Sequence, residues 1–394
     1  MKTLQMKYNV LHILFWFSYL SIYGYVAVFL QYRGLSNTDI GIVTGAGAIF
    51  SIFLSPFVSS LITKIKSLTI KKLTFILYIL MFGLFMCLIF LSLPVVLIMI
   101  FYIGLLSLVV SIVPFLSMIC MNYLKAGQYI NFGLSRGLGS VSYATGAVLV
   151  GQLIDFINPT VIGYVHFISS ILLLVLLFSM PDYKIEENNQ QENKSNVLTI
   201  IKNYKTFFII LVAFSFMFSA STSLSTYLIN IVKNLGGNTS LYGIAIFCMA
   251  ASEMPVMSIT HRLLKKYNAE TLILVASGFY ILRNFTICLA PSLPILLIGM
   301  MLQGFSYGLF TATITYYVND YLKQKDQMMG QTMIGMMSTG LGSAIGNIFG
   351  GVLQDALGLG SMLIFSGAMT LIGFVIMFIT LIKKIGIRSK RFMD

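Results

Sequence analysis

Long apolar runs follow one another along the whole chain, and no other feature limits its fold as strongly. Each run is long enough to cross a bilayer as a helix, which takes about 20 residues. Helices of this length satisfy their backbone groups internally, whereas a barrel would need short strands of alternating polarity. We count twelve such runs, near 10–31, 39–62, 72–91, 94–117, 132–155, 160–180, 205–232, 240–262, 270–290, 294–318, 328–355 and 359–382. The sequence therefore predicts an all-α integral membrane protein with 12 transmembrane helices.

The placement of the basic residues predicts the orientation of these helices. The chain is 9% charged, whereas a soluble domain is about 25% charged. If the segments between the runs alternate between two sides, 21 of the 25 lysines and arginines lie on the side that holds both termini. Only Arg33 and Lys233 lie on the other side. Because cytoplasmic loops carry the excess of basic residues, both termini should lie in the cytoplasm of a plasma-membrane protein.

The net charge of +13 would also suit a nucleic-acid partner, but charges confined to short loops beside apolar helices exclude that class. We expect the lipid bilayer and a small-molecule substrate as partners, and a monomer. All four cysteines lie inside the predicted spans without paired spacing, so we expect no disulfide, no metal site and no cofactor. The first run shows no cleavage site, so its helix should remain in the mature protein.

A polar, low-complexity segment at 184–196 divides the chain into two halves with six runs each. Such a composition buries too little apolar surface to fold, which is typical of a linker. We therefore predict an N-terminal six-helix bundle at 1–180, a cytoplasmic linker at 181–204 and a C-terminal six-helix bundle at 205–394.

The two halves repeat each other. A shift of about 200 residues places Gly146, Gly151, Leu153 and Asp155 on Gly346, Gly351, Leu353 and Asp355. The segment 34–41 likewise resembles 236–243. Because each half has six runs, the two copies have the same orientation in the membrane. This parallel duplication is typical of secondary transporters that bind their substrate near the midplane between the repeats.

Two charged residues stand inside apolar runs of the second half. Glu253 and Arg283 lie in neighbouring runs joined by the short segment 261–270. An ion at the middle of a bilayer costs about 2.5–3.5 kcal/mol on insertion scales, so such residues are paired or face a wet cavity. Their depths differ by about 6 Å, which two long side chains can bridge. We predict that Arg283 offers its planar fork to Glu253 at the working centre of a transporter; the alternative is an ion pair that only fixes helix packing.

Polar residues at helical spacing mark the first, fourth, seventh and tenth runs. They are His12, Trp16, Tyr19 and Tyr23; Ser107 and Ser111; Ser215, Ser219, Thr222, Thr226 and Asn230; and Gln303, Tyr307, Thr311 and Thr315. Any one of them can bond a backbone carbonyl, but a stripe on every third run favours a shared aqueous cavity. We take Tyr23, Asn230, Gln303 and Tyr307 as candidate substrate-binding residues. Glycines such as Gly346, in the fifth and eleventh runs, are predicted to be joints between the rocking halves.

One stretch resembles a known transporter helix. The pattern Phe132-Gly133-x-x-Arg136-x-x-Gly139-x-Val141-x-Tyr143 matches the fifth helix of lactose permease, in which the last aromatic is Trp. Ser252-Glu253-x-Pro255, Arg283 and the segment 302–308 echo the 3-phenylpropionate permease-like proteins. The chain thus resembles this branch of the major facilitator superfamily over essentially its full length. The resemblance implies two pseudo-symmetric six-helix bundles, with Arg136 binding sugar by hydrogen bonds and Tyr143 by stacking.

The chain also departs from lactose permease. The carboxylate that pairs with the fifth-helix arginine is replaced by Ser117, and the titratable His and Glu of the tenth helix are replaced by Gln303 and Ser306. Glu253 is therefore the carboxylate best placed to carry a coupled proton. The Gly-Pro signature of antiporters is missing, since residues 146–155 contain no proline.

These features predict a secondary active transporter and not an enzyme, because no nucleophile, histidine and acid share one helix face. We expect alternating access and proton-coupled uptake of a small polar or aromatic organic solute, such as an oligosaccharide, a nucleoside or an aromatic acid. The proton gradient would be the driving force. The alternative is an efflux transporter that exports drugs or other amphiphiles.

Overall fold

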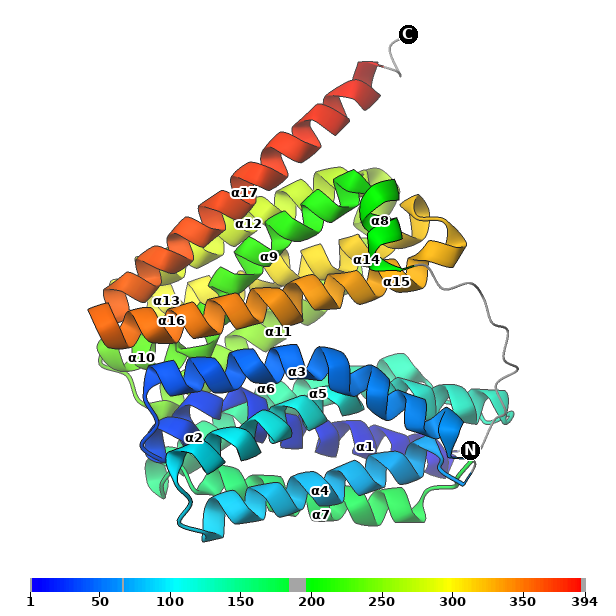
Figure 1. Ribbon diagram of the computed structural model, residues 1–394, viewed down its shortest axis with the longest axis vertical. Helices are drawn as coiled ribbons and strands as arrows, with labels where there is room; N and C mark the ends of the chain where they lie inside the picture. Colours follow the sequence, from blue (N-terminus) through cyan, green and yellow to red (C-terminus); the bar gives the residue numbers. More distant parts are fainter. Residues whose placement is uncertain (1, 66, 184–195, 391–394) are drawn as a thin grey trace. The chain divides into compact units, whose positions relative to one another are not determined.

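The computed structural model describes residues 2–65, 67–183 and 196–390, and within these residues it contains helices and no strand (Figure 1). Its contacts divide the chain into two compact units. Unit 1 comprises Met1–Asn188 and Gly237–Phe247, and unit 2 comprises Asn189–Gly236 and Cys248–Asp394. The polar stretch 184–195 of the predicted linker lies outside the described residues.

Unit 1 contains the first helices of the chain. They are α1 (Lys2–Tyr19), the π-helical turn η1 (Leu20–Gly24), α2 (Val26–Tyr32), α3 (Asn37–Lys64), α4 (Ile70–Phe90), α5 (Val95–Lys125), α6 (Phe132–Phe156) and α7 (Val161–Ser179). Several begin at a polar cap. The Ser36 hydroxyl accepts from the backbone N–H of Asp39 at the start of α3, and the Asn131 side chain accepts from Leu134 at the start of α6. Such caps satisfy N–H groups that have no partner inside the helix.

Unit 2 contains the later helices. They are α8 (Val197–Asn203), α9 (Lys205–Thr226), α10 (Leu228–Asn234), α12 (Ala269–Cys288), α13 (Leu293–Met301), the π turn η2 (Gly304–Gly308), α14 (Leu309–Tyr321), α15 (Gln324–Gly335), the π turn η3 (Met336–Gly342), α16 (Ser343–Leu357) and α17 (Leu359–Lys390). The remaining helix, α11 (Thr239–Lys266), begins in unit 1 and ends in unit 2. α8 occupies part of the predicted linker, and its Ile200 is fully buried in the core of unit 2.

The observed helices agree with the predicted spans. Among the described residues, ten helices are long and apolar enough to cross a membrane, and α1 with α2, bent by 52° between them, makes up to eleven. The eleventh predicted span, 328–355, is the one outside this set and corresponds to the helical run from α15 through η3 to α16. That run begins with many polar residues, including Lys325 and Asp326, which lowers its mean hydropathy.

The first helix of each predicted half is broken at a tyrosine, and the two tyrosines make equivalent contacts. Tyr25 separates α2 from η1, and its hydroxyl donates to the carbonyl oxygen of Ala147 on α6 at 2.5 Å. Tyr227 separates α9 from α10, and its hydroxyl donates to the carbonyl oxygen of Asn347 on α16 at 2.9 Å. The acceptors are 200 residues apart, so the same hydrogen bond recurs at the offset of the sequence repeat.

The turns that follow α2 and α10 also match. Gly34 has φ +84° and Gly236 has φ +78°, a left-handed conformation that glycine adopts without a steric penalty. These are the first residues of the two segments that resemble each other in sequence. The duplication therefore extends to backbone conformation in the two units.

The glycines of η3 and α16 pack inside unit 2, which corrects their predicted role as joints between halves. A Cβ at Gly346 would lie 2.0 Å from the carbonyl oxygen of Ser219 on α9, and Gly342 and Gly350 also face serines of that helix. On α6, Gly146 in the same way faces the ring of Phe17 on α1. Small residues allow such close backbone approach. These glycines fix the first and fifth helices of each half against each other.

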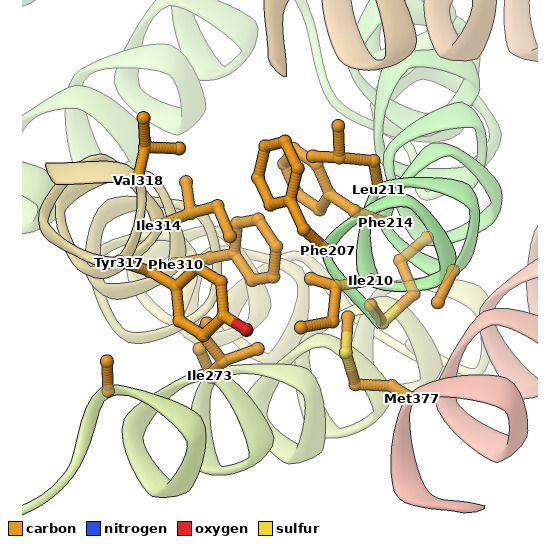
Figure 2. Packing of buried hydrophobic residues seen from close by; sticks show 14 of the residues in the cluster. Phe207, Ile210, Leu211, Phe214, Ile273, Phe310, Ile314, Tyr317, Val318 and Met377 are labelled. Carbon is orange, nitrogen blue, oxygen red and sulfur yellow. The ribbon is translucent and has the colours of Figure 1, made fainter. Parts of the chain in front are cut away.

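The core of unit 2 is an aromatic and aliphatic cluster between α9, α12, α14 and α17 (Figure 2). Phe214 of α9 and Phe310 of α14 stack with ring centroids 3.8 Å apart. Figure 1 shows α17, in red, running along α9 and α12 of the same unit, and these helices are in contact. This packing positions α12, the helix that carries Arg283.

The start of α11 is held on unit 1 by Asp155 at the end of α6. Its carboxylate accepts from the backbone N–H groups of Thr239 and Ser240, at 3.1 and 2.7 Å, and from the Ser240 hydroxyl at 2.6 Å. A carboxylate at a helix N-terminus satisfies free N–H groups and interacts favourably with the helix dipole. Asp155 therefore caps α11 from a neighbouring helix.

Candidate functional site

The predicted site residues fall into two groups, one in each unit. Unit 1 holds Tyr23, Arg136 and Tyr143, and unit 2 holds Asn230, Glu253, Arg283, Gln303 and Tyr307. In unit 1 the three residues are linked through aromatic contacts. In unit 2 the structure joins Glu253 to Gln303, while Arg283 has other hydrogen-bond partners.

Arg136 in unit 1 lies over the indole ring of Trp16. Its Cζ is 4.1 Å from the ring centroid, a cation–π contact, and its Nη1 donates to the Ser140 hydroxyl at 2.7 Å. Gly139, three residues further along α6, makes room for the indole, because a Cβ there would lie 2.3 Å from Trp16 Cδ1. A cation stacked on Trp in this way contributes about 0.5–2 kcal/mol, depending on its hydration. α6 thus fixes both the guanidinium and the ring.

Trp16, Tyr19 and Tyr23 form a continuous row of rings along α1 and η1, which we call the aromatic ladder. Trp16 and Tyr19 have ring centroids 5.1 Å apart, and Tyr19 and Tyr23 stack at 5.3 Å with an interplanar angle of 25°. Residues three or four apart are neighbours on one helix face, which explains the row. The Tyr143 ring lies 6.4 Å from Tyr19 and 6.5 Å from Trp16. The ladder is partly exposed, and Tyr23 is 37% exposed.

In unit 2, Glu253 on α11 accepts a hydrogen bond from Gln303. The distance from Gln303 Nε2 to Glu253 Oε1 is 3.1 Å. Gln303 directly precedes the π turn η2, whose Gly304 donates its N–H to the Ser252 hydroxyl at 3.0 Å. A Cβ at Gly304 would lie only 2.1 Å from the Ser252 carbonyl oxygen. π turns are frequent at functional sites, and here the turn and its glycine place the amide against the carboxylate.

Arg283 is fully buried and belongs to a polar network between α9, α12 and α17. Its Nη1 donates to the Ser221 hydroxyl at 2.9 Å and to Asn284 Oδ1 at 2.8 Å. Asn284 Nδ2 in turn donates to the Thr370 hydroxyl at 2.8 Å. Three helices therefore contribute to holding one guanidinium inside the apolar bundle.

The predicted hydrogen-bonded pair between Arg283 and Glu253 is wrong. Nε and Nη2 of Arg283, the edge that would receive a carboxylate, have no hydrogen-bond partner in the structure. Glu253 lies within electrostatic range of the guanidinium and is bonded by Gln303 instead. The sequence gives the depth of each residue in the bilayer but not its direction around the helix axis. Ser221 of α9 bonds Arg283 and Gln303, directly before η2, bonds Glu253, and depth alone could not identify either partner.

The two remaining candidates of unit 2, Tyr307 and Asn230, lie in different surroundings. Tyr307 lies within η2, and its ring is 5.8 Å from Phe218 of α9, so it shares the turn that positions Gln303. Asn230 lies on α10, beyond the break at Tyr227. That break interrupts the regular helical spacing on which the selection of Asn230 was based.

Sequence reasoning missed the partners of Arg283. Ser221 and Thr370 are hydroxyl residues on α9 and α17, far from Arg283 in sequence, and nothing in their spacing indicates the network. Asn284 carried a usable signal, because a second strongly polar side chain directly follows the arginine in an apolar run. Among the residues that the structure describes, no three or more His, Cys, Asp or Glu side chains are placed to hold a metal ion, and the four cysteines are free thiols.

The long apolar helices are those of a multi-pass membrane protein, and a family comparison gives its class. Residues 6–384 match the model of the MFS_1 like family, so the chain belongs to that family of the major facilitator superfamily. It is a multi-pass membrane protein of a family of solute transporters.

Two curated relatives are transporters. The chain is 24% identical over 267 residues to the maltose permease of Geobacillus stearothermophilus, an alignment covering 68% of this chain and 67% of that protein. It is 24% identical over 268 residues to the uncharacterized transporter YwbF of Bacillus subtilis (strain 168), covering 67% of this chain and 65% of that protein. Both alignments thus span about two thirds of the relatives.

Solved structures share the fold over nearly the whole chain. A mutant of the nucleoside transporter NupG superposes with a TM-score of 0.80 at 16% identity, covering 96% of this chain and 99% of that one. A bacterial homologue of the human lysosomal transporter Spinster gives 0.69 at 11% identity, covering 96% of each chain. These likenesses confirm the predicted fold of the major facilitator superfamily.

Proposed function

We propose that this chain is a proton-coupled uptake transporter for a small polar or aromatic organic solute, an oligosaccharide, a nucleoside or an aromatic acid. It works as a monomer in the plasma membrane with both termini in the cytoplasm, and the proton gradient drives it. The names of the maltose permease and of NupG support the first two solute classes. Arg136 and Tyr143 contact the solute, and Glu253 carries the proton.

The contact between Glu253 and Gln303 carries this proposal. An ionised carboxylate inside a membrane-spanning helix costs several kcal/mol unless it is neutralised or hydrated. Because protonation neutralises it, such a group can carry a proton in a transporter. Gln303 donates to the ionised form, and the buried charge of Arg283 favours that form as well. Protonation removes the attraction to the guanidinium and weakens the hydrogen bond from Gln303, so the contacts of α11 with α12 and with the turn at η2 differ between the two charge states. A proton can bias the conformation in this way.

The test is solute accumulation by the purified protein in liposomes under an imposed proton gradient. We expect Glu253→Gln to abolish uphill accumulation and to keep exchange of labelled for unlabelled solute, because the amide preserves shape but does not titrate. Asp320→Asn, the same change at an exposed position of α14, should leave both activities intact. Uphill uptake that persists in Glu253→Gln would remove Glu253 from the coupling role. Net export of amphiphilic dyes by the wild type would instead favour the efflux alternative.

A further inference from the structure

A cavity of about 510 Å³ lies within unit 2, at one end of three of its helices. Its walls come from the end of α11, the start of α12 and the end of α14. The same residues bound three candidate membrane spans, which end at Lys266, begin at Ala269 and end at Tyr321. The cavity, which we call the interfacial cavity, therefore lies where three spans leave the bilayer, at the level of the lipid head groups. Its volume is typical of a small-molecule site.

Contacts between the helices hold the shape of the interfacial cavity. Tyr321 of α14 donates its hydroxyl to Glu270 Oε2 of α12 at 2.9 Å, and Glu270 is buried. The Tyr321 ring also stacks on Tyr317, with ring centroids 4.3 Å apart. Between α11 and α14, the ring centroids of His261 and Tyr316 are 6.4 Å apart. Because these contacts need no ligand, the cavity is formed before a ligand enters, which lowers the cost of binding.

The interfacial cavity has a basic wall and an acidic wall. His261 and Lys265 line it from α11, and because they are four residues apart they lie on one face of that helix. Asp320 lines it from α14. All three side chains are exposed, so a ligand can reach them. A complementary ligand has a negative group for the basic wall and a hydrogen-bond donor for the carboxylate.

The position of the cavity favours a lipid over a soluble ligand. Tyr267, Tyr316 and Tyr321 line it, and tyrosine is enriched where a membrane meets water. The end of α11 lies on the side that the basic residues predict to be cytoplasmic. Basic pockets between transmembrane helices on that side are suited to phospholipid head groups, whose phosphate supplies the negative group.

We propose that the interfacial cavity binds the head group of a phospholipid in which a phosphodiester is linked to a hydrogen-bond donor, either a glycerol hydroxyl or a primary ammonium. The phosphodiester lies against Lys265 and His261, and the donor bonds to Asp320. This lipid site is separate from the proposed coupling residue, because Lys265 is about 18 Å along α11 from Glu253. The inference does not depend on which solute the protein transports.

The test compares three phospholipids with identical acyl chains. Purified, delipidated protein in detergent is titrated with phosphatidylglycerol, phosphatidylethanolamine and phosphatidylcholine, and the bound lipid is counted by native mass spectrometry. Phosphatidylcholine has the phosphodiester but no O–H or N–H donor in its head group. We expect it to bind about tenfold more weakly than phosphatidylglycerol or phosphatidylethanolamine, as the loss of one hydrogen bond to a carboxylate predicts. A preference for one of the two donor lipids identifies the donor as a hydroxyl or an ammonium.

Variants of the two walls should have different effects. Asp320→Ala removes the acceptor, so it should abolish the preference over phosphatidylcholine. Lys265→Ala removes a charge that faces the phosphodiester, so it should weaken the binding of all three lipids about tenfold. Asn319→Ala on α14 and Lys202→Ala on α8, both at exposed positions, are the matched controls and should bind as the wild type does. Circular dichroism and size-exclusion profiles check the fold of each variant.

Three results would overturn the lipid site. Equal binding of the three lipids by the wild type would show that no donor is recognised. A preference that survives in Asp320→Ala, or binding that is unchanged in Lys265→Ala, would place the lipid elsewhere on the protein. Glycerophosphoethanolamine or glycerophosphoglycerol, which lack acyl chains, should bind far more weakly than the lipids, and equal affinity would indicate a soluble ligand instead. None of these measurements involves transport, so they leave the proposed function untouched.

Discussion

A single buried guanidinium shows how the chain places charge inside a membrane. Arg283 has no exposed surface, and its hydrogen bonds come from hydroxyl and amide groups rather than from a carboxylate. Neutral acceptors hold the orientation of the group without cancelling its charge. The guanidinium therefore acts on Glu253 through space, without a hydrogen bond between them. The network thus fixes the position of the charge.

Asn284 tests this role of the network. It accepts from Arg283 and Ser221 and donates to Thr370, so Asn284→Ala removes three buried hydrogen bonds. We expect it to destabilise the protein by about 2 kcal/mol, because bonds to a charged group are worth more than neutral ones. Thermal unfolding in detergent measures the loss. Asn203→Ala, at an exposed position of α8, is the control, and equal midpoints for both variants would show that the network contributes nothing to stability.

The residues of the site could be found from the sequence more easily than their partners. Polarity inside apolar runs indicated Glu253, Arg283 and Gln303, because each is expensive to bury without a function. Their pairing depends on the direction of each side chain around its helix, and a π turn beside Gln303 changes that direction. Helical spacing assumes a regular helix, so the turn could not be anticipated.

At the scale of helices, helix breaks and glycines determine where the apolar runs are interrupted and how closely they pack. Pro56, Pro114 and Pro255 lie inside helices without ending them, whereas the chain breaks at Tyr25 and Tyr227. The sequence predicted the extent of the runs, because hydrophobic length sets it. It did not predict the breaks, because hydrophobic length does not show where a tyrosine hydroxyl bonds to another helix, as it does at each break.

Gly304 is the glycine whose replacement should affect the site most directly. In Gly304→Ala the new Cβ would meet the backbone of Ser252 at 2.1 Å, and backbone cannot rotate away as a flexible side chain can. We expect a loss of about 1–3 kcal/mol and a longer separation of Gln303 from Glu253, with loss of uphill transport. Gly278→Ala on α12 has open space around it and should keep activity, with a gain of at most about 1 kcal/mol from helix propensity. Normal accumulation by Gly304→Ala would show that the close contact is dispensable.

At the scale of the whole chain, the two units are copies that share their helix breaks and glycine contacts but differ in their site residues. The tyrosine at the helix break, the turn glycine and the glycines facing the first helix recur in both. The site residues do not: unit 1 carries stacked rings and Arg136, and unit 2 carries Glu253 and a buried arginine network. Under the proposed function, the residues proposed to contact the solute lie in one copy and the residue proposed to carry the proton lies in the other.

The equivalence of the copies predicts equal effects of equal changes. Tyr25→Phe and Tyr227→Phe each remove one hydrogen bond from the break to the fifth helix of the half, so each should cost about 1 kcal/mol of stability. The two hydroxyls bond different acceptors, Ala147 and Asn347, and their effects should add within about 0.5 kcal/mol in the double variant. Denaturant or thermal unfolding of the three variants measures this. A large effect of one change with none from the other would show that the repeated bond is structural in one copy only.

The orientation of the whole molecule decides whether transport is uptake, and the basic residues predict it. Twenty-one lysines and arginines lie on the side of the termini, so the segment after α5 should face the cytoplasm and the turn after α10 the outside. With the four native cysteines replaced by serine, Tyr129→Cys and Asn234→Cys place one exposed thiol on each side. A membrane-impermeant maleimide should label Asn234→Cys in intact cells and Tyr129→Cys only after permeabilisation. The reverse pattern would invert the predicted topology, and an inward proton gradient would then act on the opposite face of each unit.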